Sequence, residues 1–145
     1  MNLMDVTKEF GTPDLCNVYL EAMRWPDGVT CLKCNSPRVT KFVKKAGTRE
    51  RVNPKTGETE TRPVPARILH VCLECKHQFS ATTGTIFNDS HLDLECWFLA
   101  VATVMNAKSG LSAMQMKRDL GVAYKTAWYL NHRIRQAMLM IEAAD

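Results

Sequence analysis

The chain has 145 residues, 46% apolar and 23% charged side chains and a net charge of +4, which is the composition of a soluble globular protein with one ordinary domain or two small ones. No apolar run reaches the roughly 18 to 20 residues that a membrane-spanning helix needs, and residues 1–10 lack the apolar block of a signal peptide. We therefore expect a cytoplasmic protein without membrane contact, in which the six cysteines are thiols or metal ligands rather than disulfides.

Positive charge is concentrated in two separate zones. Residues 31–72 carry ten basic and three acidic side chains, and residues 111–138 carry five basic and one acidic, whereas residues 1–30 have a net charge of −3. Basic zones suit a polyanion such as nucleic acid, although charge alone is explained equally well by a solvated protein surface.

The first predicted element is a helix that begins at Thr12. Threonine is a good N-cap, Pro13 suits the first helical position, and Asp14 places a negative charge in the first turn. A turn signal at residues 25–28 ends this helix. Its apolar face consists of Leu15, Val18, Tyr19, Ala22 and Met23. We expect residues 1–30 to form an N-terminal helical segment that packs on the next domain.

Residues 31–82 have the pattern of β-structure. Apolar and β-branched residues at 39–43 and 68–71 predict two strands. Between them, residues 44–66 are polar, and Asn53-Pro54-Lys55-Thr56-Gly57 is a turn signal with basic and acidic residues on either side. We interpret residues 44–66 as a hairpin insertion that protrudes from the domain or forms a mobile arm.

Two C-x-x-C pairs, Cys31 with Cys34 and Cys72 with Cys75, predict one metal site. Two residues between the cysteines let both thiolates of a tight knuckle bind one ion, and two knuckles complete the tetrahedral site that zinc favours. The 37 residues between the pairs exceed the roughly 15 to 20 of a minimal ribbon, and the hairpin accounts for the excess. A redox pair, an iron–sulfur cluster, or His70 or His77 in place of a cysteine are the alternatives.

Residues 83–145 predict three helices. Ser90 is the expected N-cap of the first helix, with Asp93 at the capping-box position. Ser112 caps the second, which ends at Gly121, and the third runs from about residue 124 to 143. The expected apolar stripe of the first helix is Leu94, Trp97, Phe98, Val101, Val104 and Met105, and that of the last helix is Ala127, Leu130, Ile134, Met138 and Ile141.

The second and third helices, joined through Gly121-Val122-Ala123, match the spacing of a helix-turn-helix, whose last helix enters the major groove of DNA. Against the match, Lys117 occupies a position where a small residue usually faces the partner helix, and Ala123 replaces a Ser or Thr cap. A three-helix bundle with a solvated face is the alternative. The candidate DNA-contacting residues are Lys125, Thr126, Tyr129, His132, Arg133 and Gln136.

Taken together, the motifs resemble the N-terminal region of a family of bacterial insertion-sequence transposases. The resemblance covers about residues 10–138. The motifs that carry it are Arg24-Trp25-Pro26-Asp27-Gly28, the two cysteine pairs, Gln78-Phe79-Ser80, Thr82-Thr83-Gly84-Thr85-Ile86-Phe87, Trp97-Phe98-Leu99, Leu120-Gly121-Val122 and Tyr124-Lys125-Thr126-Ala127-Trp128. The resemblance implies that these segments bind the terminal inverted repeats of a transposon, and that a downstream RNase H-like domain with a carboxylate triad cuts and joins DNA.

We accordingly expect an α+β protein made of three parts, an N-terminal helix (1–30), a zinc ribbon with an extended hairpin (31–82) and an all-α helix-turn-helix module (83–145). The expected function is sequence-specific binding of double-stranded DNA at the nucleoid, with one structural zinc ion. Because no carboxylates converge as two-metal chemistry requires, we expect no enzymatic activity from this chain by itself. The alternative is a protein-interaction or regulatory module. Besides DNA, the expected partners are further copies of this chain in a homo-oligomer or a transposase catalytic domain.

Overall fold

The computed structural model describes residues 3–64 and 66–144, and it confirms an α+β fold. The chain divides into two compact units. Residues 1–23 and 82–145 form one, called here the helical unit, and residues 24–81 form the other, called here the ribbon unit. Among the described residues, none of the helices combines the length and the apolarity needed to cross a membrane.

The ribbon unit contains five antiparallel strands in two sheets. They are β1 (Val39–Lys44), β2 (Gly47–Val52), β3 (Thr59–Val64), β4 (Arg67–Cys72) and β5 (Gln78–Phe79). One sheet has the order β1-β4-β5, and the other pairs β2 with β3. The predicted hairpin is confirmed, and its turn closes through hydrogen bonds from the Asn53 N–H to the Glu58 carbonyl (2.9 Å) and from the Gly57 N–H to the Asn53 carbonyl (2.8 Å).

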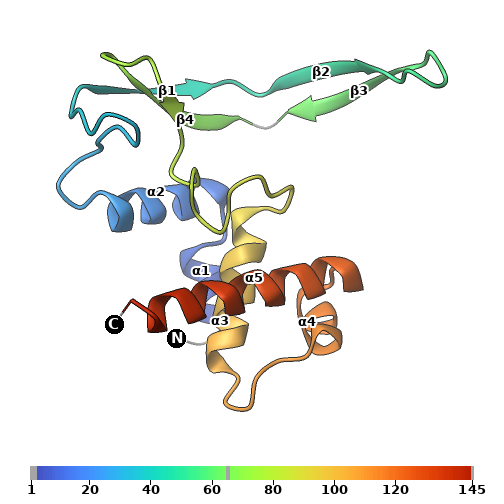
Figure 1. Cartoon of the computed structure of the whole chain (residues 1–145). Helices are drawn as coiled ribbons and strands as arrows, with labels where there is room; N and C mark the ends of the chain where they lie inside the picture. Colours follow the sequence, from blue (N-terminus) through green and yellow to red (C-terminus); the bar gives the residue numbers. More distant parts are fainter. Residues whose placement is uncertain (1–2, 65, 145) are drawn as a thin grey trace. The chain divides into compact units, whose positions relative to one another are not determined.

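The β1–β4 and β2–β3 ladders of the ribbon unit pair their residues in the same register, so that one continues the other. Lys44 lies opposite Arg67 at the end of the β1–β4 ladder, and Gly47 lies opposite Val64 at the start of the β2–β3 ladder. The β2–β3 pair therefore continues the β1–β4 pair as one long hairpin, which Figure 1 shows (blue-green to green).

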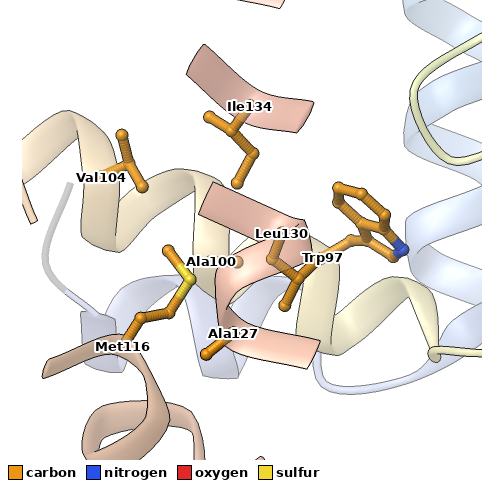
Figure 2. Close-up of a cluster of buried hydrophobic side chains, with 7 residues drawn as sticks. All are labelled: Trp97, Ala100, Val104, Met116, Ala127, Leu130 and Ile134. Atoms are coloured by element: carbon orange, nitrogen blue, oxygen red, sulfur yellow. The ribbon is translucent and has the colours of Figure 1, made fainter. Parts of the chain in front are cut away.

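The helical unit consists of α1 (Leu3–Glu9), α2 (Pro13–Arg24, of which the last residue belongs to the ribbon unit), α3 (Leu94–Asn106), α4 (Ala113–Leu120) and α5 (Tyr124–Glu142). The main core lies between α3, α4 and α5, as Figure 2 shows. Its buried residues are Trp97, Ala100, Val104, Met116, Ala127, Leu130 and Ile134. The predicted caps of α4 are confirmed, because the Gln115 N–H donates to the Ser112 hydroxyl (3.1 Å) and Gly121 adopts the left-handed conformation (φ 65°).

A second core joins the N-terminal helices to α3. Val6, Phe10 and Cys16 are buried there, and the Phe10 ring packs edge-on against Tyr19 (4.9 Å between centroids) and Phe98 (5.0 Å). The helix α1 was not predicted. Burial of Val6 and Phe10 against α3 places residues 3–23 in the helical unit, so the N-terminal segment of this unit ends at residue 23 and not at residue 30 as the sequence predicts.

Two details of the predicted helices are wrong. Ser90 does not cap α3, since Asp93 is the N-cap and the Ser90 hydroxyl instead accepts from the indole N–H of Trp97 (2.9 Å). The buried seam of α5 ends at Ile134, because Met138 and Ile141 are 40% and 65% exposed. Helical spacing identifies an apolar stripe, but whether a neighbouring element covers it depends on the length of that neighbour.

Candidate metal centre and nucleic-acid interface

The two cysteine pairs form two backbone knuckles of the same shape. In the first, the Asn35 N–H donates to the Cys31 carbonyl (3.0 Å), and in the second, the Lys76 N–H donates to the Cys72 carbonyl (3.1 Å). Asn35 and Lys76 both adopt left-handed conformations, with φ of 56° and 59°. This turn directs both side chains of each pair to the same side, as a chelating knuckle requires.

The β-sheet brings the two knuckles together. Cys72 is the last residue of β4 and lies opposite Val39, a few residues after the first knuckle. The Leu73 N–H then donates to the Arg38 carbonyl (2.9 Å), which ties the second knuckle to the start of β1. Pairing of β1 with β4 therefore closes the loop between the cysteine pairs, however long the hairpin beyond it is.

The four sulfur atoms are arranged as metal ligands. All four lie within 4.8 Å of one another, and the Sγ atoms of Cys31 and Cys75, and of Cys34 and Cys72, are 3.5 Å apart. A tetrahedral zinc ion with bonds of about 2.3 Å would need Sγ–Sγ distances of about 3.8 Å, which falls inside this range. The six cysteines are all free thiols. The cluster thus fits one metal ion.

The electrostatics of the cluster favour a cation. Burial raises the pKa of Cys31, but the backbone N–H groups of Cys34 and Lys33 and the neighbouring thiols outweigh it and lower this pKa to about 6. Contact with the backbone of Cys75 likewise lowers the pKa of Cys72. For Cys34, a backbone hydrogen bond at Ser36 lowers the pKa, but burial and the other three thiols raise it to about 12. Four adjacent sulfurs cannot all ionise by themselves, whereas a divalent cation stabilises all four thiolates.

Around the four cysteines, a few aromatic side chains pack together in a small core. Cys31, Cys72 and Phe79 are buried, and both histidines that were considered as alternative ligands pack on Phe79. The ring centroids of His70 and His77 lie 5.5 and 6.0 Å from that of Phe79. The four-cysteine group contains neither histidine. Both histidines therefore pack against Phe79 and do not belong to the metal cluster.

Helices α4 and α5 are joined by a short turn at residues 121–123. Met116 is the residue of α4 that is fully buried against Ala127 and Leu130 of α5, whereas Lys117 is exposed. Lys117 thus lies outside the buried contact between α4 and α5, which Met116 fills. Ala123 is the N-cap of α5 and provides no side-chain hydrogen bond, as its methyl group dictates.

The candidate DNA-contacting residues all lie on α5, outside its buried stripe. Lys125, Tyr129, His132 and Gln136 are exposed, and Thr126 and Arg133 are half-buried. On the same helix, the exposed rings of Trp128 and His132 are in contact, with their centroids 4.1 Å apart and their planes tilted by 49°. This surface combines basic, amide and aromatic groups, which can contact phosphates, base edges and sugars respectively.

Arg133 is also a structural residue. Its guanidinium donates to the Asn88 carbonyl (3.4 Å) and to the Tyr129 hydroxyl, and it lies 5.4 Å from the centroid of the Tyr129 ring. It therefore joins α5 to the loop before α3, and only its remaining N–H groups are available to a ligand.

Sequence reasoning missed Asn131 and Arg135. Both side chains donate to the Leu111 carbonyl, from the Asn131 Nδ2 (2.7 Å) and from an Arg135 guanidinium nitrogen (2.8 Å). They hold the α3–α4 connection against α5. A polar residue such as Asn131, directly after the core residue Leu130, was the one signal that could have revealed this contact.

Comparison with known proteins relates the chain to a transposable element. No family model and no solved structure match it. Over 119 residues it is 29% identical to a protein of Halobacterium salinarum described as an uncharacterized protein in transposable element ISH50. The match covers 82% of this chain, which spans 33% of the length of that curated relative.

Proposed function

We propose that this chain is the DNA-binding part of a transposon-encoded protein, that it recognises the terminal inverted repeats of its element, and that it does not cleave DNA by itself. The metal in the four-cysteine site is zinc in a structural role. The observation that carries the proposal is the exposed basic and aromatic face of α5, which follows α4 after a short turn. The similarity to a protein of a transposable element supports it.

In this proposal α5 lies in the major groove of a DNA duplex. Lys125, at the start of the helix, contacts a phosphate, and the free N–H groups of Arg133 contact another. His132 and Gln136 lie about two and about three turns after Lys125 on the exposed face, where their side chains reach base edges. Zinc contributes no chemistry to the complex, because a closed site of four cysteines leaves no open coordination position.

The experiment begins with selection of bound duplexes from a random pool, using the purified chain with zinc. A single recovered motif is expected. Lys125→Ala should then lower the slope of log K against log salt by about 1, and Gln136→Ala should weaken the selected site by about 1–3 kcal/mol and relax its sequence preference. The matched control is Lys108→Ala, which removes an exposed lysine outside α5. Recovery of no motif, or equal effects of Lys125→Ala and Lys108→Ala, would refute the assignment of α5.

The absence of catalysis is tested separately. The chain should leave a supercoiled plasmid that carries the selected site intact in the presence of Mg²⁺ or Mn²⁺. Cleavage that co-purifies with this chain, and that is absent from fractions without it, would contradict this part of the proposal.

A protein-interaction module is the second candidate function. It is favoured by the end of α5, where the four consecutive residues Met138, Leu139, Met140 and Ile141 are 40–65% exposed. Such apolar exposure is typical of surfaces that contact another protein. If the chain self-associates or binds a catalytic domain while duplex affinity stays in the non-specific range, this candidate replaces the first.

A further inference from the structure

The excess positive charge of the chain lies in one hairpin. Residues 44–67 contain seven lysines and arginines and three glutamates, so that this segment has a net charge of +4, and the net charge of the whole chain is also +4. The other 121 residues are neutral in sum, because acidic residues elsewhere offset the second basic zone at residues 111–138. A strongly basic segment of this kind suits a polyanionic ligand.

The register of the hairpin places like charges opposite each other. Arg49 of β2 lies opposite Arg62 of β3, and Lys44 of β1 lies opposite Arg67 of β4. Directly opposed like charges destabilise an antiparallel pair. Among the described residues, Arg62 has an ion pair with Glu60 (3.1 Å), and Arg49 and Arg51 have none. The hairpin thus carries a repulsion that an external anion would relieve.

The arginines share one face of the ribbon. Side chains alternate between the faces of a strand, and opposed residues point to the same face, so Arg49, Arg51 and Arg62 lie together. Glu60 lies on the same face, opposite Arg51 and paired with Arg62, which leaves the face with an excess of two positive charges. They line an open hollow along the hairpin. All six residues of β2 and all but the last of β3 are exposed, so this part of the hairpin buries no core. Its ladder keeps the arginines in a fixed row although they contribute nothing to folding.

We propose that the β2–β3 ribbon is a second duplex-DNA contact, which binds phosphates through the face formed by Arg49, Arg51 and Arg62. The inference rests on the proposed function for the identity of the ligand, but it concerns a different surface from α5. From Gly47 to Val52 the ribbon extends about 17 Å, at about 3.4 Å per residue. A two-stranded ribbon fits the major groove, which is about 12 Å wide and bounded by phosphates on both sides.

The test compares three forms of the full chain loaded with zinc, on the duplex selected for the wild type. R49A/R62A removes the opposed arginines, R49K/R62K keeps their charge, and K8A/K108A removes two exposed lysines of the helical unit. Zinc content and helical circular dichroism establish that each form is folded. Because each phosphate contact contributes a slope of about 0.9 in log K against log salt, R49A/R62A should lower the slope by about 1.8. Between 200 and 50 mM salt, its affinity deficit relative to wild type should then grow roughly 12-fold.

R49K/R62K and K8A/K108A should both keep the wild-type slope. Hydroxyl-radical footprinting should show a protected backbone segment that R49A/R62A loses and Lys125→Ala keeps. If R49A/R62A retains the wild-type slope and footprint, the ribbon proposal is refuted and the assignment of α5 stands. If R49A/R62A loses the footprint and no α5 variant has any effect, the proposed function of α5 is overturned and the ribbon proposal stands. Tighter binding to an acidic peptide or to single-stranded RNA than to duplex also refutes the ribbon proposal.

Discussion

Replacement of Cys72 by serine should unfold the ribbon unit while the helical unit stays folded. The apolar core of the ribbon unit is small, since only Cys31, Cys72 and Phe79 of its cluster are fully buried, with Trp25, Val29, Val39 and Cys75 packed against them in part. Burial of the three fully buried side chains contributes roughly 5 kcal/mol, of which Phe79 supplies about half.

Metal binding is therefore the largest single stabilising contribution in the ribbon unit. Structural zinc sites in small domains contribute about 10–16 kcal/mol of folding free energy. Loss of one of four thiolates opens the site and removes most of that contribution, which exceeds the roughly 5 kcal/mol from apolar burial. The two cores of the helical unit contain no residue between 24 and 81, so they do not depend on the metal.

The assay combines metal analysis with amide hydrogen exchange. The wild type should hold one zinc per chain, and its β1–β4 amides should exchange slowly. Cys72→Ser should hold almost none, and those amides should exchange as in an unfolded chain while α3 and α5 remain protected. Cys96→Ser, a half-buried cysteine of the helical unit, is the control and should keep one zinc. Slow exchange of the β1–β4 amides without metal would refute the reasoning.

Two further predictions concern the helical unit. Asn131→Ala should lower the free energy of unfolding by about 1–2 kcal/mol. The double variant Asn131→Ala/Arg135→Ala should lower it by more than the sum of the two single changes, because only the double variant leaves the Leu111 carbonyl without both of its donors. Additive costs in urea unfolding would contradict this coupling. Burial, with a smaller effect of the Glu95 charge, raises the pKa of Cys16 to about 11 from an ordinary 9.0. Because Cys16 is also fully buried, a reagent reaches it only after local opening of the helical unit. Its alkylation at pH 8 should therefore be at least about 100-fold slower in the folded chain than in urea, as peptide mass spectrometry can measure, and equal rates would show that the thiol is accessible.

Much of the ribbon unit could be predicted from local sequence. The spacing of the two cysteine pairs predicts the metal site, and the sulfur positions confirm that four cysteines can hold one ion. The turn at Asn53–Gly57 predicts the hairpin, because Asn, Pro and Gly favour the conformations of a turn whatever surrounds it. The shared register of the two ladders follows from a single hairpin turn, from which strand pairing continues.

The limits of sequence reasoning appear at the apolar faces of helices. Spacing correctly grouped Leu15, Val18 and Met23 on one face of α2, yet these side chains are 48–65% exposed, and Cys16 is the residue that α2 buries. Periodicity shows which side chains share a face. It does not show whether that face meets another element, since this depends on residues far away in the chain.

What the sequence by itself determined are the features set by a few neighbouring residues: the chelating spacing of the cysteines, the hairpin turn, and the caps of α4 at Ser112 and Gly121. The tertiary structure decided which surfaces are covered. It buried Met116 and exposed Lys117, and it joined Arg133 to the Asn88 carbonyl, 45 residues away in sequence. Caps, turns and chelating pairs form within one or two turns of backbone, whereas burial is a property of packed pairs of elements, and no local pattern specifies the partner.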